Sequence, residues 1–276
     1  MATGLTQTVY RPTGPLACHV RAYEMLSTDG AKPVSMLGSA RADVLVALRF
    51  GDPIVIEGCT PTMVESGAVV GPRTRSVWLR FDGSIDQVNV LFFPGAAGAF
   101  VGLSMPDLVG QVAAADDVWS TDFRDALADL GSLPVTERIS RLESLLLARL
   151  QPRLEAGPQV QEAVRLIEAT GGRATVPWLA DEVNLSVSQL ERNFKRHVGV
   201  GPKMLARQTR VSEVAADALA AGSPDWALLA CKHGYADQAH LAREFREFFT
   251  LTPSAFEAMG ADADFLQDAC ASLYLR

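Results

Sequence analysis

The sequence predicts an α+β chain of two domains, a β-rich domain followed by an all-helical one. Short β-branched and aromatic runs separated by turn residues fill the chain up to about residue 95. From about Gly98 onward, apolar residues recur at helical spacing instead. With 276 residues, 48% of them hydrophobic and 21% charged, the chain is typical of a globular protein long enough for two cores.

Four runs of the first half are typical of strands, and turn residues such as Gly51-Asp52-Pro53 and Asp82-Gly83 separate them. Several short strands with such turns favour a small sandwich or barrel. The four runs are Asp43–Phe50, Pro53–Glu57, Ser76–Phe81 and Gln87–Phe93.

A helical extension follows the strands. Leu133 to Leu150 places Ile139, Leu142 and Leu146 on one stripe of a helix. Pro152 and Gly157-Pro158 then predict a linker, so we divide the chain into residues 1–154 and 155–276.

The second domain is predicted to consist of helices alone. Ser186 with Gln189 matches a capping box, which sets the start of one helix. Gly222 ends a long helix, and Ser223-Pro224 is the expected cap and first position of the next. The predicted helices cover 160–169, 176–183, 186–197, 202–220, 224–234, 237–249 and 253–259.

This helical half repeats itself. Leu179-Ala180 and Leu229-Ala230 each open a copy, and each copy continues through a tight turn into a second helix. The second helix carries Leu and Phe four residues apart, with Arg two positions after Leu and Pro eight positions after Phe. A helix, a tight turn and a second helix held by such an apolar pair form a helix-turn-helix unit.

The open face of each second helix carries side chains suited to reading base edges. The second helix of such a unit enters the major groove, where Arg can bind guanine and Gln can bind adenine. The connecting helix of about 18 residues spans roughly 27 Å, enough to place two such helices about one DNA turn apart. The predicted base-reading residues are Ser188, Gln189, Arg192, Gln238, His240 and Arg243.

Positive charge concentrates at this motif although the chain carries a net charge of −7. Between Ser186 and Arg210, six basic side chains stand against Glu191 alone. Non-specific DNA affinity comes from such Lys and Arg side chains on phosphates. The predicted phosphate contacts are Ser186, Lys195, Arg196, Lys203, Arg207 and Arg246.

The segment from Tyr235 to Arg246, ending at Leu251-Thr252-Pro253, resembles the second helix-turn-helix signature of AraC/XylS-type transcription regulators. The segment from Leu179 through Gly199-Val200-Gly201-Pro202 resembles the first. Ala239, Leu241 and Gly201 depart from the residues usual in that family, and none of the three is a predicted base-reading position. The resemblance implies a C-terminal all-α double helix-turn-helix domain that binds promoter DNA.

The first half resembles the amino-terminal region of one branch of the same family. The residues that carry this looser match are Phe93-Pro94-Gly95-Ala96-Ala97 and Asp116-Asp117-Val118-Trp119. It implies a cupin-like β-barrel with a helical extension, which serves as a sensor or dimerisation domain. The effector is unknown, and RNA polymerase is a further candidate partner.

The helical stripe of Ile139 to Leu150 leaves two alternatives. It can pair with the same stripe of a second subunit, or it can pack on its own barrel. We favour the homodimer, because symmetric partners let a regulator hold two half-sites.

Enzyme chemistry is not expected, and no cofactor is. A metal cupin needs clustered histidines, but residues 1–154 contain only His19. No G-x-S-x-G, P-loop or dinucleotide-binding motif is present. Met1 to Arg21 has no signal-peptide pattern and no run is typical of a membrane helix, so we expect a cytoplasmic protein. The four cysteines, Cys18, Cys59, Cys231 and Cys270, are expected to be buried thiols.

One rival hypothesis comes from another functional class. A ligand-binding or protein-interaction module can keep this helical fold without reading DNA, and the acidic net charge of the second half favours it. The two hypotheses differ in one observable, because only DNA binding through phosphates weakens steeply with salt.

Overall fold

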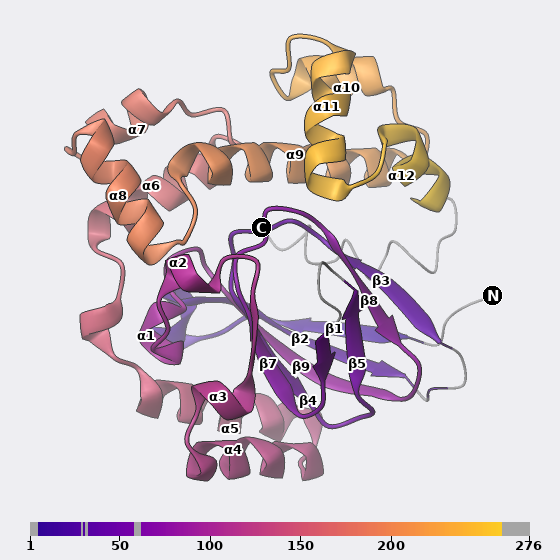
Figure 1. The fold of residues 1–276 in the computed structure, drawn as a ribbon, viewed down its shortest axis with the longest axis vertical. Helices are drawn as coiled ribbons and strands as arrows, with labels where there is room; N and C mark the ends of the chain where they lie inside the picture. The colour runs from indigo at the N-terminus through magenta and orange to yellow at the C-terminus, as the bar shows by residue number, and fades with distance from the viewer. Residues whose placement is uncertain (1–4, 29, 31–32, 58–61, 261–276) are drawn as a thin grey trace.

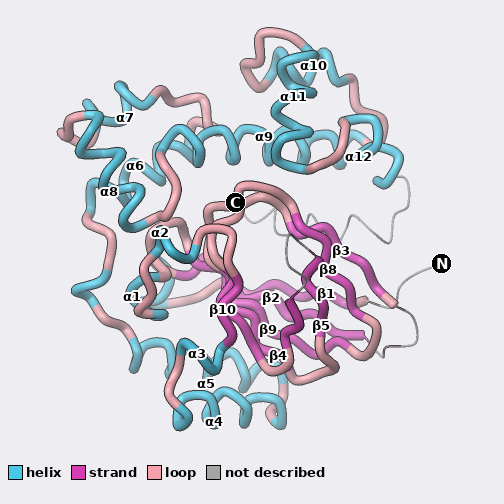
Figure 2. The backbone as a smooth tube through the Cα atoms, in the orientation of Figure 1, coloured by secondary structure: helices cyan, strands magenta, loops and turns pink. Residues whose placement is uncertain are grey.

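The computed structural model describes residues 5–28, 30, 33–57 and 62–260. They form a β-rich first domain and a helical second domain, which lies across one end of the sheets (Figure 1). Figure 2 shows that, among the described residues, strands occur in the first domain alone, while the second consists of helices and loops. The predicted α+β class with two such regions is therefore confirmed.

The strands of the first domain form two antiparallel sheets. The six-stranded sheet has the order β1-β2-β9-β4-β7-β10, and the four-stranded sheet has the order β3-β8-β5-β6. Their bounds are β1 Thr6–Tyr10, β2 Val20–Thr28, β3 Val34–Gly38, β4 Leu45–Arg49, β5 Ile54–Glu57, β6 Thr62–Val64, β7 Gly67–Val70, β8 Val77–Phe81, β9 Ile85–Phe92 and β10 Val112–Ala114.

The four strands that the sequence predicts correspond to β4, β5, β8 and β9. An apolar cluster that includes Leu26, Met36, Ile56 and Phe81 joins the inner faces of the two sheets. Burial of such side chains stabilises each by about 1.5–3 kcal/mol relative to exposure. This cluster holds the four-stranded sheet against the six-stranded one.

Helices cover the remaining faces of the first domain. In Figure 1, α3, α4 and α5 lie on the side of the sheets opposite α9. The helical bounds are α1 Gly98–Val101, α2 Met105–Leu108, α3 Ala115–Val118, α4 Thr121–Ala128 and α5 Val135–Arg149, with 3-10 turns η1 Gly14–Cys18, η2 Asp129–Ser132 and η3 Pro152–Leu154.

The leucine stripe of α5 packs on its own domain. Leu142 and Leu146 are 1% and 3% exposed and join the core formed by the six-stranded sheet, α1 and α2. Ile139 and Leu150 pack against the same core. The buried part of the stripe therefore packs on its own barrel, as in the second of the two alternatives, and association with a second copy stays a prediction.

The second domain contains the seven expected helices, with the long helix α9 at its centre. Their bounds are α6 Pro158–Ala169, α7 Val176–Glu182, α8 Val187–His197, α9 Pro202–Ala221, α10 Trp226–Lys232, α11 Gln238–Phe249 and α12 Pro253–Gly260. None of the helices in the described ranges combines the length and apolar character that crossing a bilayer requires.

One predicted helix start is wrong. Asp225, and not Ser223, is the N-cap of α10: its Oδ1 accepts hydrogen bonds of 3.0 Å from the amides of Ala227 and Leu228. The later start lets Trp226, the first helical residue, bury its ring to 8% exposure and donate its indole N–H to Glu257. That burial outweighs the local preference for the Ser-Pro pair.

The prediction of buried thiols is also wrong for two cysteines. Cys18 and Cys231 are exposed. Cys231 lies on the outer side of α10, whose inner side is formed by Leu229 and Ala230. Cys59 and Cys270 lie outside the described residues.

Candidate DNA-binding surface and effector cavity

The first helix-turn-helix unit consists of α7 and α8. Leu190 and Phe194, four residues apart on α8, are both fully buried, as is Leu179 of α7, and Ala180 is 2% exposed. The turn between the helices passes through Asn184, which has a left-handed φ of 53° and is one of the residues that tolerate this conformation. The predicted core of the first unit is therefore confirmed by its geometry.

The predicted capping box at the start of α8 is present. The Ser186 Oγ accepts a hydrogen bond from the Gln189 amide, while the Gln189 Oε1 accepts from the Ser186 amide at 2.9 Å. These bonds satisfy two amides that a helix start leaves without partners. They also occupy the Gln189 Oε1, so a bidentate contact with adenine would have to break the cap.

The second unit consists of α10 and α11 and repeats the first. Leu241 and Phe245 are fully buried, and Ala230 of α10 is 2% exposed. Phe245 stacks on Phe249 with ring centroids 4.5 Å apart, and Phe256 of α12 meets both rings. This aromatic core fixes α11 on its unit.

The open faces of α8 and α11 lie outside the buried core at every predicted base-reading residue except His240. His240 is half-buried, with its ring edge on Tyr235 at 5.2 Å between centroids. Its role and those of the other predicted base-reading residues remain predictions. The exposed members of the set are Ser188, Gln189, Arg192, Gln238 and Arg243.

The five basic residues among the predicted phosphate contacts fall into two groups. Lys195, Arg196, Lys203 and Arg246 are exposed, and none forms an ion pair with an acid in the described part of the chain. Arg207 is different, because acidic side chains hold its guanidinium. A phosphate would have to displace them.

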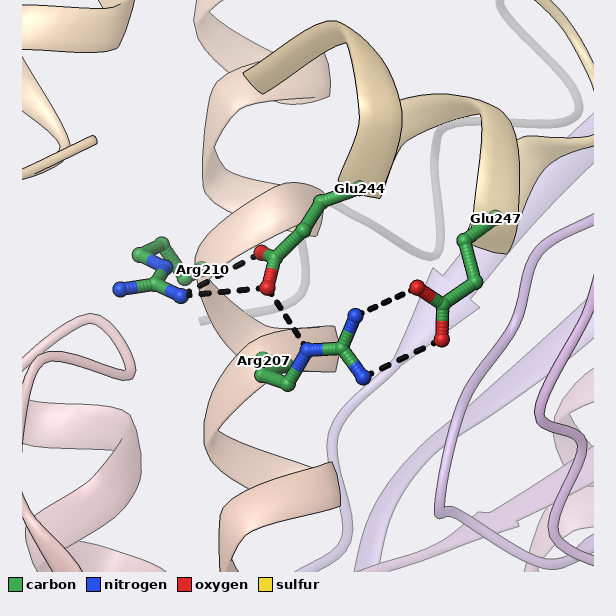
Figure 3. A network of polar contacts seen from close by, with 4 residues as sticks. All are labelled: Arg207, Arg210, Glu244 and Glu247. Carbon is green, nitrogen blue, oxygen red and sulfur yellow. Dashed lines mark hydrogen bonds and ion pairs between the residues drawn. The ribbon is translucent and has the colours of Figure 1, made fainter. Parts of the chain in front are cut away.

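Arg207 belongs to an ion-pair network that ties α11 to α9 (Figure 3). Its Nε donates to Glu244 at 2.6 Å, and its two terminal nitrogens donate to the carboxylate of Glu247. Arg210 contacts the second oxygen of Glu244 at 3.3 Å and stacks over Tyr235, 4.6 Å from the ring centroid. The network therefore fixes the orientation of a recognition helix on the connecting helix.

The arginines of the network shift the pKa of Glu244. Burial alone would raise this pKa, but hydrogen bonds and charges from Arg207 and Arg210 outweigh it and hold the pKa below its usual value of 4.5. The carboxylate is therefore ionised at neutral pH.

The network was not anticipated from the sequence. One signal was available: α9 carries two arginines three residues apart, and α11 carries two glutamates at the same spacing. Residues three apart share one face of a helix, so the two pairs can match.

Both recognition helices end on the first domain (Figure 1). Behind α8, the Cα of Gly199 lies so close to the Met105 carbonyl that an added Cβ would approach that oxygen to 2.9 Å. At the end of α11, the Ser76 amide donates to the Phe248 carbonyl at 2.7 Å, and the Ser76 hydroxyl donates to the Phe249 carbonyl at 2.6 Å. The N-termini, which read bases in such units, therefore point away from the sheets.

The segment from Pro72 to Ser76 contacts both helix-turn-helix units and α9. Besides Ser76 on α11, Pro72 lies beside Gly199, and the Arg73 carbonyl accepts from the Gln208 side chain of α9 at 2.7 Å. The Arg73 side chain also lines a cavity between the two sheets. One segment thus contacts the cavity and both helix-turn-helix units.

That cavity has a volume of about 90 Å³, several times the ~10–15 Å³ that one water needs. Aliphatic side chains of both sheets line most of it, and a row of hydrogen bonds crosses one wall. Arg49 donates to Gln87, Gln87 to Asn89, and Asn89 to the Oε2 of Glu24 at 3.4 Å. The other oxygen of Glu24, Oε1, is buried without a partner.

Charges at the same end of the cavity come from Arg41, Asp43 and Arg73. Burial and the neighbouring charge of Arg41 lower the pKa of Arg73 to about 10. In the described ranges, no three His, Cys, Asp or Glu side chains gather as metal ligands would.

Comparison with known proteins gives one family match. Residues 179–259 match the model of a family described as a helix-turn-helix domain. No curated protein matched the chain. The helical domain is therefore a helix-turn-helix domain of AraC type. The match supports a DNA-binding role for this domain.

Solved structures of low identity also match. ToxT from Vibrio cholerae is 11% identical, with a TM-score of 0.47 over 93% of this chain and 99% of that one. Unsaturated fatty acid bound wild-type ToxT from Vibrio cholerae is 10% identical, with a TM-score of 0.46 over 93% of this chain and 96% of that one. The AraC-like transcriptional activator CuxR is 16% identical, with a TM-score of 0.25 over 68% and 80% of the two chains.

Proposed function

We propose that this chain is a sequence-specific regulator that reads promoter DNA with α8 and α11 together and is modulated by a small molecule in the first domain. One observation carries the proposal. The open faces of α8 and α11 present Arg and Gln outward, and both helices have their N-termini away from the sheets. This arrangement suits entry of both helices into the major groove from one side.

The residues divide into two roles. Arg192, Gln238 and Arg243 are exposed on the reading faces and match the geometry of guanine and adenine edges. Ser188 and His240 are further contacts, and Gln189 offers its amide NH₂ while its oxygen keeps the cap. Phosphate contacts come from the exposed, unpaired Lys195, Arg196, Lys203 and Arg246 and from Ser186, with Arg207 only if Glu244 and Glu247 release it.

Selection of bound sites from random DNA with the purified chain tests the proposal. Arg243→Ala should cost about 1–3 kcal/mol at the selected site and relax the choice of one base. Lys203→Ala should weaken all sequences alike and lower the salt slope by about one. If both variants bind the selected site as the wild type does, the assigned roles are wrong.

The cavity supports effector modulation. An effector with an apolar body and a hydrogen-bond donor would fill the aliphatic walls and satisfy the buried Glu24 Oε1. Its binding should raise the melting temperature of the full chain by mass action and change operator affinity through the segment from Pro72 to Ser76. An Ala68→Leu variant, which fills the cavity, should abolish the response, and a response that survives would place the effector elsewhere.

The rival module without DNA readout makes the opposite prediction for salt. It predicts no salt-dependent affinity for a random duplex, whereas phosphate contacts predict a steep loss between about 50 and 200 mM salt. Association with a second copy and with RNA polymerase remain predictions. Measurement of the molar mass in solution tests the first of them.

A further inference from the structure

A basic cleft of about 820 Å³ separates the recognition helix α8 from the first domain. One wall is formed by α8 and includes Ser188, Arg192 and Lys195. The other wall is formed by the segment from Gly102 to Pro106 and by η3, which includes Arg153. The volume lies in the range of clefts that hold a drug-sized molecule, so a stretch of extended polymer fits.

Positive charge enters this cleft from both domains. Arg192, Lys195 and Arg196 line it from α8, and Arg153 lines it from the opposite wall. All four are exposed, and none pairs with an acid among the residues that the structure describes. Among the described residues of the lining, Glu191 is the one acid. The cleft is therefore built for an anion, unlike the neutralised cluster around Arg207.

The far wall is held in place by backbone contacts. The Gln151 amide donates to the Ala99 carbonyl of α1 at 2.8 Å, and the Leu154 amide donates back to Gln151 at 2.9 Å. Arg153 thus projects from a segment that is fixed to the first domain, across the cleft from α8.

The position of the cleft identifies the anion. A recognition helix in a major groove about 12 Å wide has a phosphate backbone on each side. The cleft borders α8 at Lys195 and Arg196, the predicted phosphate contacts, next to the predicted base-reading residue Arg192, which is where one of these backbones would run. A free small anion would meet the same charges, but only a DNA strand is brought there by α8 itself.

We propose that this cleft receives the phosphate backbone of one DNA strand and that Arg153 of the first domain contacts it. The inference rests on the proposed function and extends the DNA-binding surface beyond the helix-turn-helix domain. The first domain then takes part in positioning α8 on DNA.

Binding of the full chain to a random-sequence duplex, titrated with salt, tests the contact. One lost phosphate contact lowers the slope of log K against log salt by about 0.9, which corresponds to about five-fold weaker binding at 0.15 M salt. We expect this change for Arg153→Gln, while Arg153→Lys retains most of the affinity. Arg141→Gln is the matched control, because Arg141 is also exposed but lies on α5, away from α9 (Figure 1).

A proximity readout accompanies the titration. With the photo-reactive residue p-benzoylphenylalanine in place of Leu154, which is 42% exposed at the same wall, we expect a crosslink to the duplex. Wild-type binding that lacks salt dependence refutes the proposed function. Salt-dependent wild-type binding that Arg153→Gln leaves unchanged or strengthens overturns the present inference alone, whatever the crosslink shows.

Discussion

Replacement of Glu244 by Gln tests the network that orients α11 on α9. The Glu244 side chain is 8% exposed and binds two arginines, whose side chains are 22% and 19% exposed. Removal of one partner from a fully buried ion pair costs about 3–5 kcal/mol, and an exposed pair contributes about 0–1 kcal/mol. Arg207 and Arg210 keep some access to water, and Arg207 keeps Glu247. We therefore expect a loss of about 2 kcal/mol in the free energy of unfolding.

Urea unfolding at neutral pH measures this loss, with Glu247→Gln as the matched control. Glu247 is on the same helix and binds the same arginine, but it is 45% exposed, so its replacement should cost less than about 1 kcal/mol. Equal losses in the two variants would refute the reasoning that burial makes the contribution of Glu244 to stability larger than that of Glu247.

The difference in unfolding free energy between wild type and Glu244→Gln should also depend on pH. The folded-state pKa of Glu244 lies below its unfolded value of 4.5, so its contribution is fully present above that value. The contribution is lost as the pH falls through the folded-state pKa. The stability difference between wild type and Glu244→Gln should therefore shrink in acid, and a difference that grows in acid would contradict the assignment.

Three further predictions concern the elements around the recognition helices. Asp225→Ala removes the N-cap of α10 and should cost about 1 kcal/mol in urea unfolding, while Ser223→Ala should leave stability unchanged. Asp217→Asn weakens the contacts to Lys232 and His233 at 2.8 and 2.6 Å. Burial would raise the pKa of Asp217, but these partners hold it below 3.8, so the loss of about 1 kcal/mol should fade below that pH. Ser76→Ala removes a hydrogen bond between the domains and should weaken their association by about 1 kcal/mol. Limited proteolysis measures this effect, because cleavage between the domains should become faster.

The repeat made the helical domain predictable. Local signals agree there with the fold: the buried Leu190–Phe194 and Leu241–Phe245 pairs recur in register, and Ser186 caps its own helix. The exposed reading faces follow directly from those pairs, because a helix that buries one face exposes the other. For the same reason most candidate site residues lie where the spacing places them.

Strands buried on both faces were harder to predict. β2 is buried from Val20 to Leu26, so it shows no alternation of apolar and polar residues, and it includes the charged Arg21 and Glu24. Arg21 pairs with Glu168 of the helical domain, and Glu24 faces the cavity. Partners that are distant in the sequence stabilise these charges in the interior. No local sequence pattern indicates which residues those partners are.

The contacts between the domains were also beyond sequence reasoning. Carbonyl groups of Arg73, Phe248 and Phe249 accept most of those hydrogen bonds. Every residue carries a carbonyl, so the sequence holds no signal for which of them will be used. The position of Arg153 across from α8 likewise emerges only from the fold.

The spacing of the two half-sites tests most directly whether α8 and α11 read DNA together. The 20 residues of α9 span about 30 Å, close to one turn of DNA. Insertion of roughly five base pairs between the half-sites of a selected operator rotates one by about half a turn. We predict that affinity then falls to that of a single half-site, and undiminished affinity for the lengthened operator would contradict joint reading by the two helices.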